Sequence, residues 1–430
     1  MGETSVAAKK GQGRDGRTLL RSFGLGIITG AADDDCSAVG TYSQAGAAFG
    51  YTFLWTVPLL PPMMVAVVYL SSKLGQVTGQ GLFAVIRSHF PRWLLYSILA
   101  CVVVGNTIEA GADIGGIAAA LHLLLPMPQT LLVTGVAAIS LVLQIWGSYR
   151  LISNIFRLLS LSLLAYVASM VLSHPDVGEI GRAIFRPSIR FDRESLSMLV
   201  AMIGTALSAY LFTWQSNEEV EEKIATGQGD PGKRRGTTGR HLRRTALDVA
   251  IGMFFSALVM YSIIMATAAT LHKSGQHQIE TAAQAAQALA PVAGHAAGLL
   301  FSLGIVGVGF LAIPVMTTGA AYDVCQSLNC RNGLNLKLRE GKVFYGTITG
   351  VVIAAAAMNF LGINPMRALV FAGIVQGVST PPLMLLIMLL TNRRSVVGDK
   401  ANTPLANGMG WATTLITSAA SLALIGSYLW

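Results

Sequence analysis

Long apolar segments separated by short polar ones run through the whole chain. A helix needs about 20 predominantly apolar residues to cross a bilayer, and eleven segments meet that length. They cover residues 20–48, 51–71, 93–124, 129–147, 151–173, 194–217, 245–271, 291–323, 342–361, 365–390 and 408–429. The pattern predicts an all-α polytopic membrane protein, a single transmembrane domain over residues 1–430 that begins with a cytoplasmic tail at 1–19.

Prolines interrupt the second of these segments. Pro58, Pro61 and Pro62 lie within 51–71. A transmembrane helix tolerates proline where neighbouring helices satisfy the freed backbone groups. We therefore expect a kink in this segment.

Composition and charge agree with a membrane protein. Hydrophobic residues make up 53% of the chain and charged residues 12%, about half the charged share of a soluble domain. Most of the 30 Lys and Arg residues fall in loops on one side of the predicted crossings. By the positive-inside rule this places the N-terminus in the cytoplasm and, after eleven crossings, the C-terminus outside the cell membrane. The net charge of +9 thus predicts an orientation in the bilayer and no nucleic-acid partner.

An acidic triplet interrupts the first apolar segment. Asp33, Asp34 and Asp35 lie between Gly30 and Gly40 in a run of small residues. A carboxylate inside the hydrocarbon region costs several kcal/mol unless something compensates it. Glycine and small residues suit a helix that unwinds locally and offers its carbonyls. The stretch predicts an intramembrane cation site; the alternative is a set of acids at a helix end in water.

The third segment carries polar residues on one face. Asn106, Glu109 and Asp113 recur at spacings of three and four, which places them together on a helix. Such a face inside a membrane lines an aqueous path or meets a partner charge. Glu109 and Asp113 are therefore candidates for a proton or ion path, with a structural network as the alternative. Gln376, a polar position in segment 365–390, is a further candidate.

The sixth segment is the second one with a break in its apolar pattern. Gly204, Thr205 and Ser208 lie near the middle of 194–217. Two interrupted helices five positions apart are the layout of an inverted five-plus-five repeat with a site at the midplane. The first repeat would span 20–173 and the second 194–390, with an eleventh helix at 408–429.

At these segments the chain resembles the NRAMP (natural resistance-associated macrophage protein) family of divalent-metal transporters, over nearly its full length. The matching stretches are Asp35 to Ala38, Ala45 to Tyr51, Gly204 to Ser216 and Thr391 to Arg394. The resemblance implies a LeuT-like fold, with a metal ion bound between the broken helices one and six.

The resemblance also implies which residues bind the metal. The family's Asp-Pro-Gly-Asn motif falls on residues 35–38, so the aspartate is kept as Asp35 and the asparagine is replaced by Ala38. The family's Met-Pro-His motif falls on residues 208–210, and every member is changed, to Ser208, Ala209 and Tyr210. The implied metal site thus comprises Asp35, the carbonyls of Ala32 and Thr205, Ser208 and the position of Ala38, with Asp34 as an added candidate beside them.

The changed motif alters the chemistry expected of the site. A thioether suits soft transition metals, whereas carboxylate, hydroxyl, carbonyl and water oxygens suit magnesium, calcium and manganese. With Ser208 the chain resembles an NRAMP-related branch that lacks the methionine and handles magnesium and manganese. Tyr210 in place of histidine removes a group that titrates near neutrality, which puts proton coupling in doubt. Asp113 matches the family's helix-three acid, and Tyr210 joins Glu109, Asp113 and Gln376 as candidates for a proton or ion path.

These observations predict a transporter that moves divalent cations inward by alternating access. The metal is the substrate, and we expect no cofactor and a monomer in the bilayer. No nucleophile with a nearby base, phosphate loop or metal-hydrolase spacing suggests an enzyme. The alternatives are a LeuT-like symporter for an amino acid or another small solute, and a metal sensor. An amino-acid site needs a free helix N-terminus aimed at a carboxylate, which three clustered acids would repel.

Overall fold

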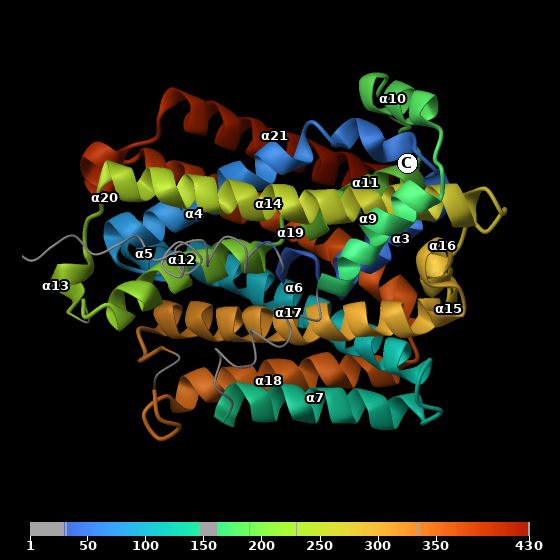
Figure 1. Ribbon diagram of the computed structural model, residues 1–430. Coiled ribbons are helices and arrows are strands. Elements are labelled where there is room, and N and C mark those ends of the chain that lie inside the picture. Colours follow the sequence, from blue (N-terminus) through green and yellow to red (C-terminus); the bar gives the residue numbers. More distant parts are fainter. Residues whose placement is uncertain are drawn as a thin grey trace, which may run out of the picture.

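The computed structural model describes residues 30, 32–146, 161–188, 190–228, 230–333 and 336–428. All regular structure in these ranges is helical (Figure 1). The predicted tail at 1–19, the start of segment 20–48 and the first part of segment 151–173 lie outside the described residues.

Eight helical segments in the described part of the chain are long and apolar enough to cross a membrane. They overlap with eight of the predicted segments. They are formed by α6 (Arg92–His122), α7 (Gln129–Trp146), α11 (Arg193–Ala206) with α12 (Ala209–Ala225), α14 (Gly239–Thr267) with the π-helix η3 (Ala268–His272), the elements from α15 (Ala282–Ala286) to α17 (Ala297–Leu328), α18 (Lys342–Met358) with η6 (Asn359–Leu361), α19 (Pro365–Asn392) and α21 (Pro404–Ser427). The other predicted segments contain α3 (Cys36–Phe49), α4 (Leu60–Thr78) and α9 (Leu164–Leu172). Since two of these border residues that are not described, the number of eleven crossings stays a prediction.

The boundaries and the kink predicted for segment 51–71 are wrong. Residues Thr52–Thr56 form the 3-10 helix η1, and α4 starts only at Leu60. Pro61 and Pro62 occupy its first turn, where an amide hydrogen would have no partner in the helix and proline is therefore tolerated. The prolines start α4 and do not bend it.

Helix α4 continues beyond the apolar run because α12 covers its polar residues. The Ser71 hydroxyl donates to the carbonyl oxygen of Phe212, and the Ser72 hydroxyl donates to Glu219 Oε1 at 2.6 Å. Buried polar groups of this kind are tolerated when each has a hydrogen-bond partner. The sequence pattern alone ends the segment at residue 71, whereas packing extends the helix to Thr78.

The centre of the bundle is α6, which packs against α17, α18 and α19. On one flank α11 packs on α19 so closely that a Cβ atom at Gly204 would overlap the backbone of Gly373 and Gly377. On the other flank α14 packs on α3 and α4. Both halves of the broken sixth segment are thus held against the core, α11 by α19 and α12 by α4.

Short helices gather at the two ends of the long ones (Figure 1). At one end lie α13 (Pro231–Arg234) and α20 (Arg394–Val397), both in basic loops predicted to be cytoplasmic. At the other end lie α10 (Val177–Phe185) and α15 (Ala282–Ala286), in loops predicted to be outside, and α16 (Ala290–Ala293), which falls at the start of predicted segment 291–323. The remaining short elements are α5 (Leu82–His89), η2 (Leu161–Leu163), η4 (Gln287–Leu289), η5 (Gly294–Ala296), η6 (Asn359–Leu361) and η7 (Gly398–Lys400).

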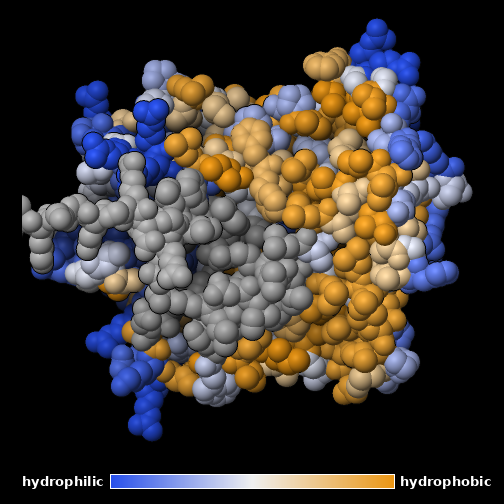
Figure 2. Space-filling model, in the orientation of Figure 1, coloured by the Kyte–Doolittle hydropathy of each residue, from blue (hydrophilic) through white to orange (hydrophobic). Residues whose placement is uncertain are grey.

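The surface is apolar along the sides of the helices and polar at both of their ends (Figure 2). On α14 the exposed side chains Leu247, Ile251, Phe254 and Leu258 recur at spacings of three and four, so they form one outward face. An apolar side surface between two polar ends is what a bilayer requires of a bundle of spanning helices.

Candidate metal site

The first broken helix is interrupted at the acidic triplet. Residues 34 and 35 lie outside regular helix, and α3 begins at Cys36 with Asp35 as its N-cap. The Asp35 carboxylate accepts hydrogen bonds from the Ala38 amide at 2.7 Å and from the Ser37 hydroxyl at 2.8 Å. A short polar side chain at the N-cap satisfies an amide that the first turn of a helix leaves free. Asp35 is therefore held in place by the helix that it starts.

The sixth segment breaks between α11 and α12. Helix α11 ends at Ala206, and Ser208 precedes the first residue of α12 with an extended backbone. The Ser208 hydroxyl points back along the chain, donating to the carbonyl oxygens of Gly204 at 2.8 Å and Thr205 at 3.3 Å. Thr205 thus offers its carbonyl to the break, while its own hydroxyl bonds to Ala201 within α11.

Tyr210 joins the two breaks. Its hydroxyl lies 2.9 Å from the carbonyl oxygen of Ala32 and 3.0 Å from Asp35 Oδ2. A phenol has one hydrogen to donate, so one oxygen atom of α12 lies beside two oxygen atoms of the first segment. All three residues are fully buried. The tyrosine at the position of the family's histidine therefore lies between the two helix breaks.

Glu109 on α6 receives hydrogen bonds from three other helical segments. The hydroxyl oxygens of Ser37 and Ser208 lie within hydrogen-bond distance of its Oε1, at 3.1 and 3.3 Å, and Gln376 of α19 donates to its Oε2 at 2.5 Å. The same Gln376 accepts from the Ala209 amide at 3.4 Å. The sequence suggested Glu109 and Gln376 as residues of a proton or ion path. The structure places both beside the break between α11 and α12.

Asp113 lies one turn further along α6 and contacts the start of α3. Its Oδ1 accepts from the Ser37 amide at 3.2 Å, and its Oδ2 has no hydrogen-bond partner among the described residues. An acid at the N-terminus of a helix is favoured by the helix dipole. Ser37 thus connects Asp35, Glu109 and Asp113. The sequence analysis missed Ser37, and its only signal was a hydroxyl two residues after Asp35.

Asp34 and Ala38 have different positions from the rest of the predicted set. The Asp34 carboxylate faces α14, where the Ser256 hydroxyl donates to its Oδ1 at 3.0 Å. Ala38 contributes its backbone amide to Asp35 and has no side-chain donor atom. The hydrogen bonds of the site therefore bring together Asp35, Ala32, Thr205, Ser208, Tyr210, Glu109, Asp113 and Gln376, with Asp34 on the opposite side toward α14.

The charge of the site is not balanced by basic side chains in the described part of the chain. Five acids at or next to the two helix breaks are at most 3% exposed, namely Asp33, Asp34, Asp35, Glu109 and Asp113. The ion pairs found among the described residues join Arg367 to Glu280 and Lys400 to Asp399, and all four of these side chains lie elsewhere. Buried charges are costly unless they are paired or bind a metal. The group therefore fits a cation.

The donor atoms indicate which kind of cation fits. No cluster of three His, Cys, Asp or Glu side chains able to hold a metal occurs among the described residues, so carbonyl, hydroxyl or water oxygens would have to complete the shell. The Cys36 thiol donates to the Ile305 carbonyl of α17 and does not hydrogen-bond to the Asp35 group. An oxygen-only shell is typical of hard divalent cations.

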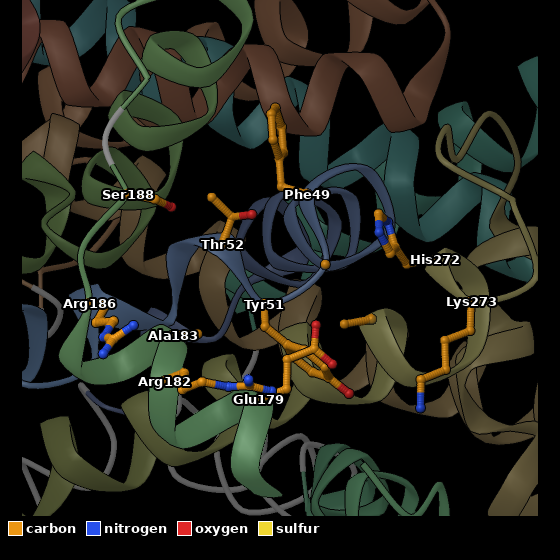
Figure 3. Close-up of a pocket in the computed structure, with 12 residues that line it drawn as sticks. Phe49, Tyr51, Thr52, Glu179, Arg182, Ala183, Arg186, Ser188, His272 and Lys273 are labelled. Carbon is orange, nitrogen blue, oxygen red and sulfur yellow. The ribbon is translucent and has the colours of Figure 1, made fainter. Parts of the chain in front are cut away.

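A separate cavity of about 410 Å³ lies at the end of the molecule where α10 is found (Figure 3). Arg182, Arg186, His272 and Lys273 line it together with Glu179. In Figure 3 Arg186 lies on one side of the cavity, and His272 and Lys273 lie on the other. A lining with more basic than acidic groups repels a divalent cation. The cavity is therefore a poor candidate for the metal site.

Comparisons with known proteins agree with this geometry. The family described as "Natural resistance-associated macrophage protein-like" matches residues 26–427. A relative from Klebsiella pneumoniae subsp. pneumoniae, the divalent metal cation transporter MntH, is 26% identical over 432 residues, which cover 99% of each chain.

Two solved structures show the same fold. The Eremococcus coleocola manganese transporter, in complex with an aromatic bis-isothiourea substituted compound, has a TM-score of 0.73 and 19% identity, over 97% of this chain and 88% of that one. Mhp1, a nucleobase-cation-symport-1 family transporter in a closed conformation with bromovinylhydantoin bound, has a TM-score of 0.59 and 16% identity, over 95% and 92%. These matches confirm the predicted LeuT-like helical fold.

Proposed function

Because this chain belongs to the natural resistance-associated macrophage protein-like family, we propose that it transports divalent metal cations across the cell membrane. Its similarity to a divalent metal cation transporter over 99% of its length supports this proposal. In the proposed cycle the two broken helices bind the ion between them, and the protein works as a monomer that opens to either side in turn, carrying the ion inward.

The observation that carries the proposal is the position of Tyr210. One phenol oxygen lies within 3.0 Å of both the Ala32 carbonyl and the Asp35 carboxylate. Two oxygen atoms that share one small neighbour are close enough to share a cation. A cation arriving at Asp35 would take over the Ala32 carbonyl from the tyrosine hydroxyl. The Thr205 carbonyl and the Ser208 hydroxyl lie at the break of the sixth segment, five and two residues before Tyr210 respectively. The ion would thus replace the hydrogen bonds through which Tyr210 joins the two breaks.

We propose magnesium and manganese as the favoured ions. Carboxylate, carbonyl and hydroxyl oxygens suit these ions better than they suit cadmium. Ala38 leaves space where the family has a longer side chain, and magnesium dehydrates reluctantly and keeps several of its waters. Metal uptake would bring few protons along, since the family's histidine is of a residue type that titrates near pH ~6.5 and a tyrosine is not.

Uptake by proteoliposomes tests the proposal. We expect wild-type protein to take up Mn²⁺ and Mg²⁺ with little signal from an internal pH dye, and Asp35→Asn to reduce uptake to the level of empty liposomes. Asp399→Asn is the matched control, because Asp399 is an exposed acid paired with Lys400. Full uptake by Asp35→Asn would overturn the assignment of the site, and acidification in step with metal entry would overturn the proposed lack of proton coupling.

A further inference from the structure

Ser256 of α14 lies between two of the buried aspartates. Its hydroxyl oxygen is 2.8 Å from Asp33 Oδ2 and 3.0 Å from Asp34 Oδ1. Asp33 and Ser256 are fully buried and Asp34 is 3% exposed. Three oxygen-bearing side chains therefore meet inside the bundle, on the side of the first segment that faces α14.

Asp33 and Asp34 can reach Ser256 because the backbone of the first segment is in close contact with that of α14. Gly30 packs directly on the backbone of Gly252, where a Cβ atom on Gly30 would overlap the Gly252 carbonyl group. Ser256 is four residues after Gly252 and so lies on the same face of α14. Because the backbones touch at Gly30, the short side chains of Asp33 and Asp34 reach Ser256.

The hydrogen bonds at Ser256 cannot satisfy both acids. A serine hydroxyl has one hydrogen, so it donates to one carboxylate at a time. The other oxygen of the Asp33 carboxylate, Oδ1, is buried and has no hydrogen-bond partner among the described residues. No ion pair between described residues reaches either acid. Two adjacent buried carboxylates repel each other, and among the described residues neither a second hydrogen-bond donor nor a positively charged side chain compensates this pair.

We propose that Asp33, Asp34 and Ser256 form a second divalent-cation site, separate from the site at Asp35. Two carboxylates balance the charge of one divalent ion, and all three side chains offer oxygen, which suits Mg²⁺, Ca²⁺ or Mn²⁺. The sites are separate because the Asp35 carboxylate is bound by Ala38, Ser37 and Tyr210 and does not hydrogen-bond to Ser256. The proposal concerns binding and does not depend on transport.

Counting bound Mn²⁺ ions tests the proposal. Full-length protein in lipid nanodiscs is titrated with Mn²⁺ alone, and free Mn²⁺ is measured by electron paramagnetic resonance. We expect two ions per wild-type chain and one ion for the double variant Asp33→Asn/Asp34→Asn. Asp35→Asn should also bind one ion, because it loses the ion at Asp35 and keeps the ion at Asp33 and Asp34. The matched control is Asp323→Asn, a fully buried acid on α17, which should keep two ions.

Two results would overturn the proposal: one Mn²⁺ per wild-type chain, or two per chain in Asp33→Asn/Asp34→Asn. A purely electrostatic role of these acids would weaken binding at Asp35 but leave the number of ions unchanged. If the double variant does not fold, Ser256→Ala decides: we expect the dissociation constant of one ion to rise about tenfold and that of the other to stay the same. Unchanged affinity for both ions would refute the second site. The proposed function fails separately, if Asp35→Asn transports normally.

Discussion

At position 208 the side chain faces the acidic group, because its hydroxyl lies 3.3 Å from Glu109 Oε1. We expect Ser208→Met to increase the potency of Cd²⁺ as a competitor of Mn²⁺ uptake by about tenfold, since a thioether is a soft ligand. The measurement is Mn²⁺ uptake into proteoliposomes over a range of Cd²⁺ concentrations, with Ser418→Met on α21 as the control.

A wild type that already binds Cd²⁺ far more tightly than Mn²⁺, with no effect of Ser208→Met, would contradict the proposed preference for hard ions. Cys36 would then be the soft ligand to consider. That role would require its thiol to leave the Ile305 carbonyl to which it donates.

The other residue-scale prediction concerns Tyr210. We expect Tyr210→His to make Mn²⁺ uptake fall as the pH drops through about 6.5, because a protonated imidazole next to Asp35 would repel the incoming cation. Tyr210→Phe is the matched control: it removes the same hydroxyl and adds no group that titrates in this range. Initial uptake rates between pH 5.5 and 8 provide the measurement. A fall of equal size in both variants would show that the lost hydroxyl causes it.

Residues with a motif or a charge could be placed from the sequence, and serines outside the family motifs could not. Asp35, Ala32 and Thr205 came from the register of two family motifs, and the structure brings them to the two helix breaks. Ser37 and Ser256 were missed because serine in a run of small residues looks like a packing residue. Only the folded chain shows that Ser256, more than 200 positions away, meets Asp33 and Asp34.

At the scale of elements, the contact between α11 and α19 depends on glycine. We expect Gly204→Val to lower the stability of the protein by about 1–3 kcal/mol, the usual cost of overpacking, because its side chain would overlap the backbone of Gly373 and Gly377. Gly135→Val on α7 is the matched control, since a Cβ there would meet no atom within 4 Å. Thermal unfolding in detergent measures both; equal midpoints would show that α11 and α19 have room to separate.

Helix boundaries were predictable where an apolar run ends in a polar loop. Segment 342–361 agrees with α18 (Lys342–Met358) followed by η6 (Asn359–Leu361). The bounds of segment 51–71 were wrong because two effects move α4 toward the C-terminus: prolines delay its start, and hydrogen bonds to α12 stabilise polar residues at its end. Hydropathy records neither effect, because the first depends on the backbone of proline and the second on a helix that is distant in sequence.

At the scale of the whole molecule, the grouping of loops at the two ends allows a test of orientation. We expect Lys233→Cys to react with a membrane-impermeant maleimide only after the cell membrane is opened, and Gln278→Cys to react in intact cells. Both positions are exposed. The background carries serine at Cys101 and Cys330, which are partly exposed, and keeps the buried Cys36 and Cys325. The reverse pattern would invert the predicted topology.

The buried acids also bear on how a carrier of this kind turns over. While a cation is bound, their charge is balanced; once it leaves, the carboxylates repel one another in a medium that screens charge poorly. In an alternating-access cycle the unloaded protein must still swing back. Repulsion among the carboxylates would raise the energy of the unloaded protein during this change of conformation. The return without an ion would therefore be the slower half of the cycle. An ion waiting on the far side would then speed turnover by taking the place of the one just released.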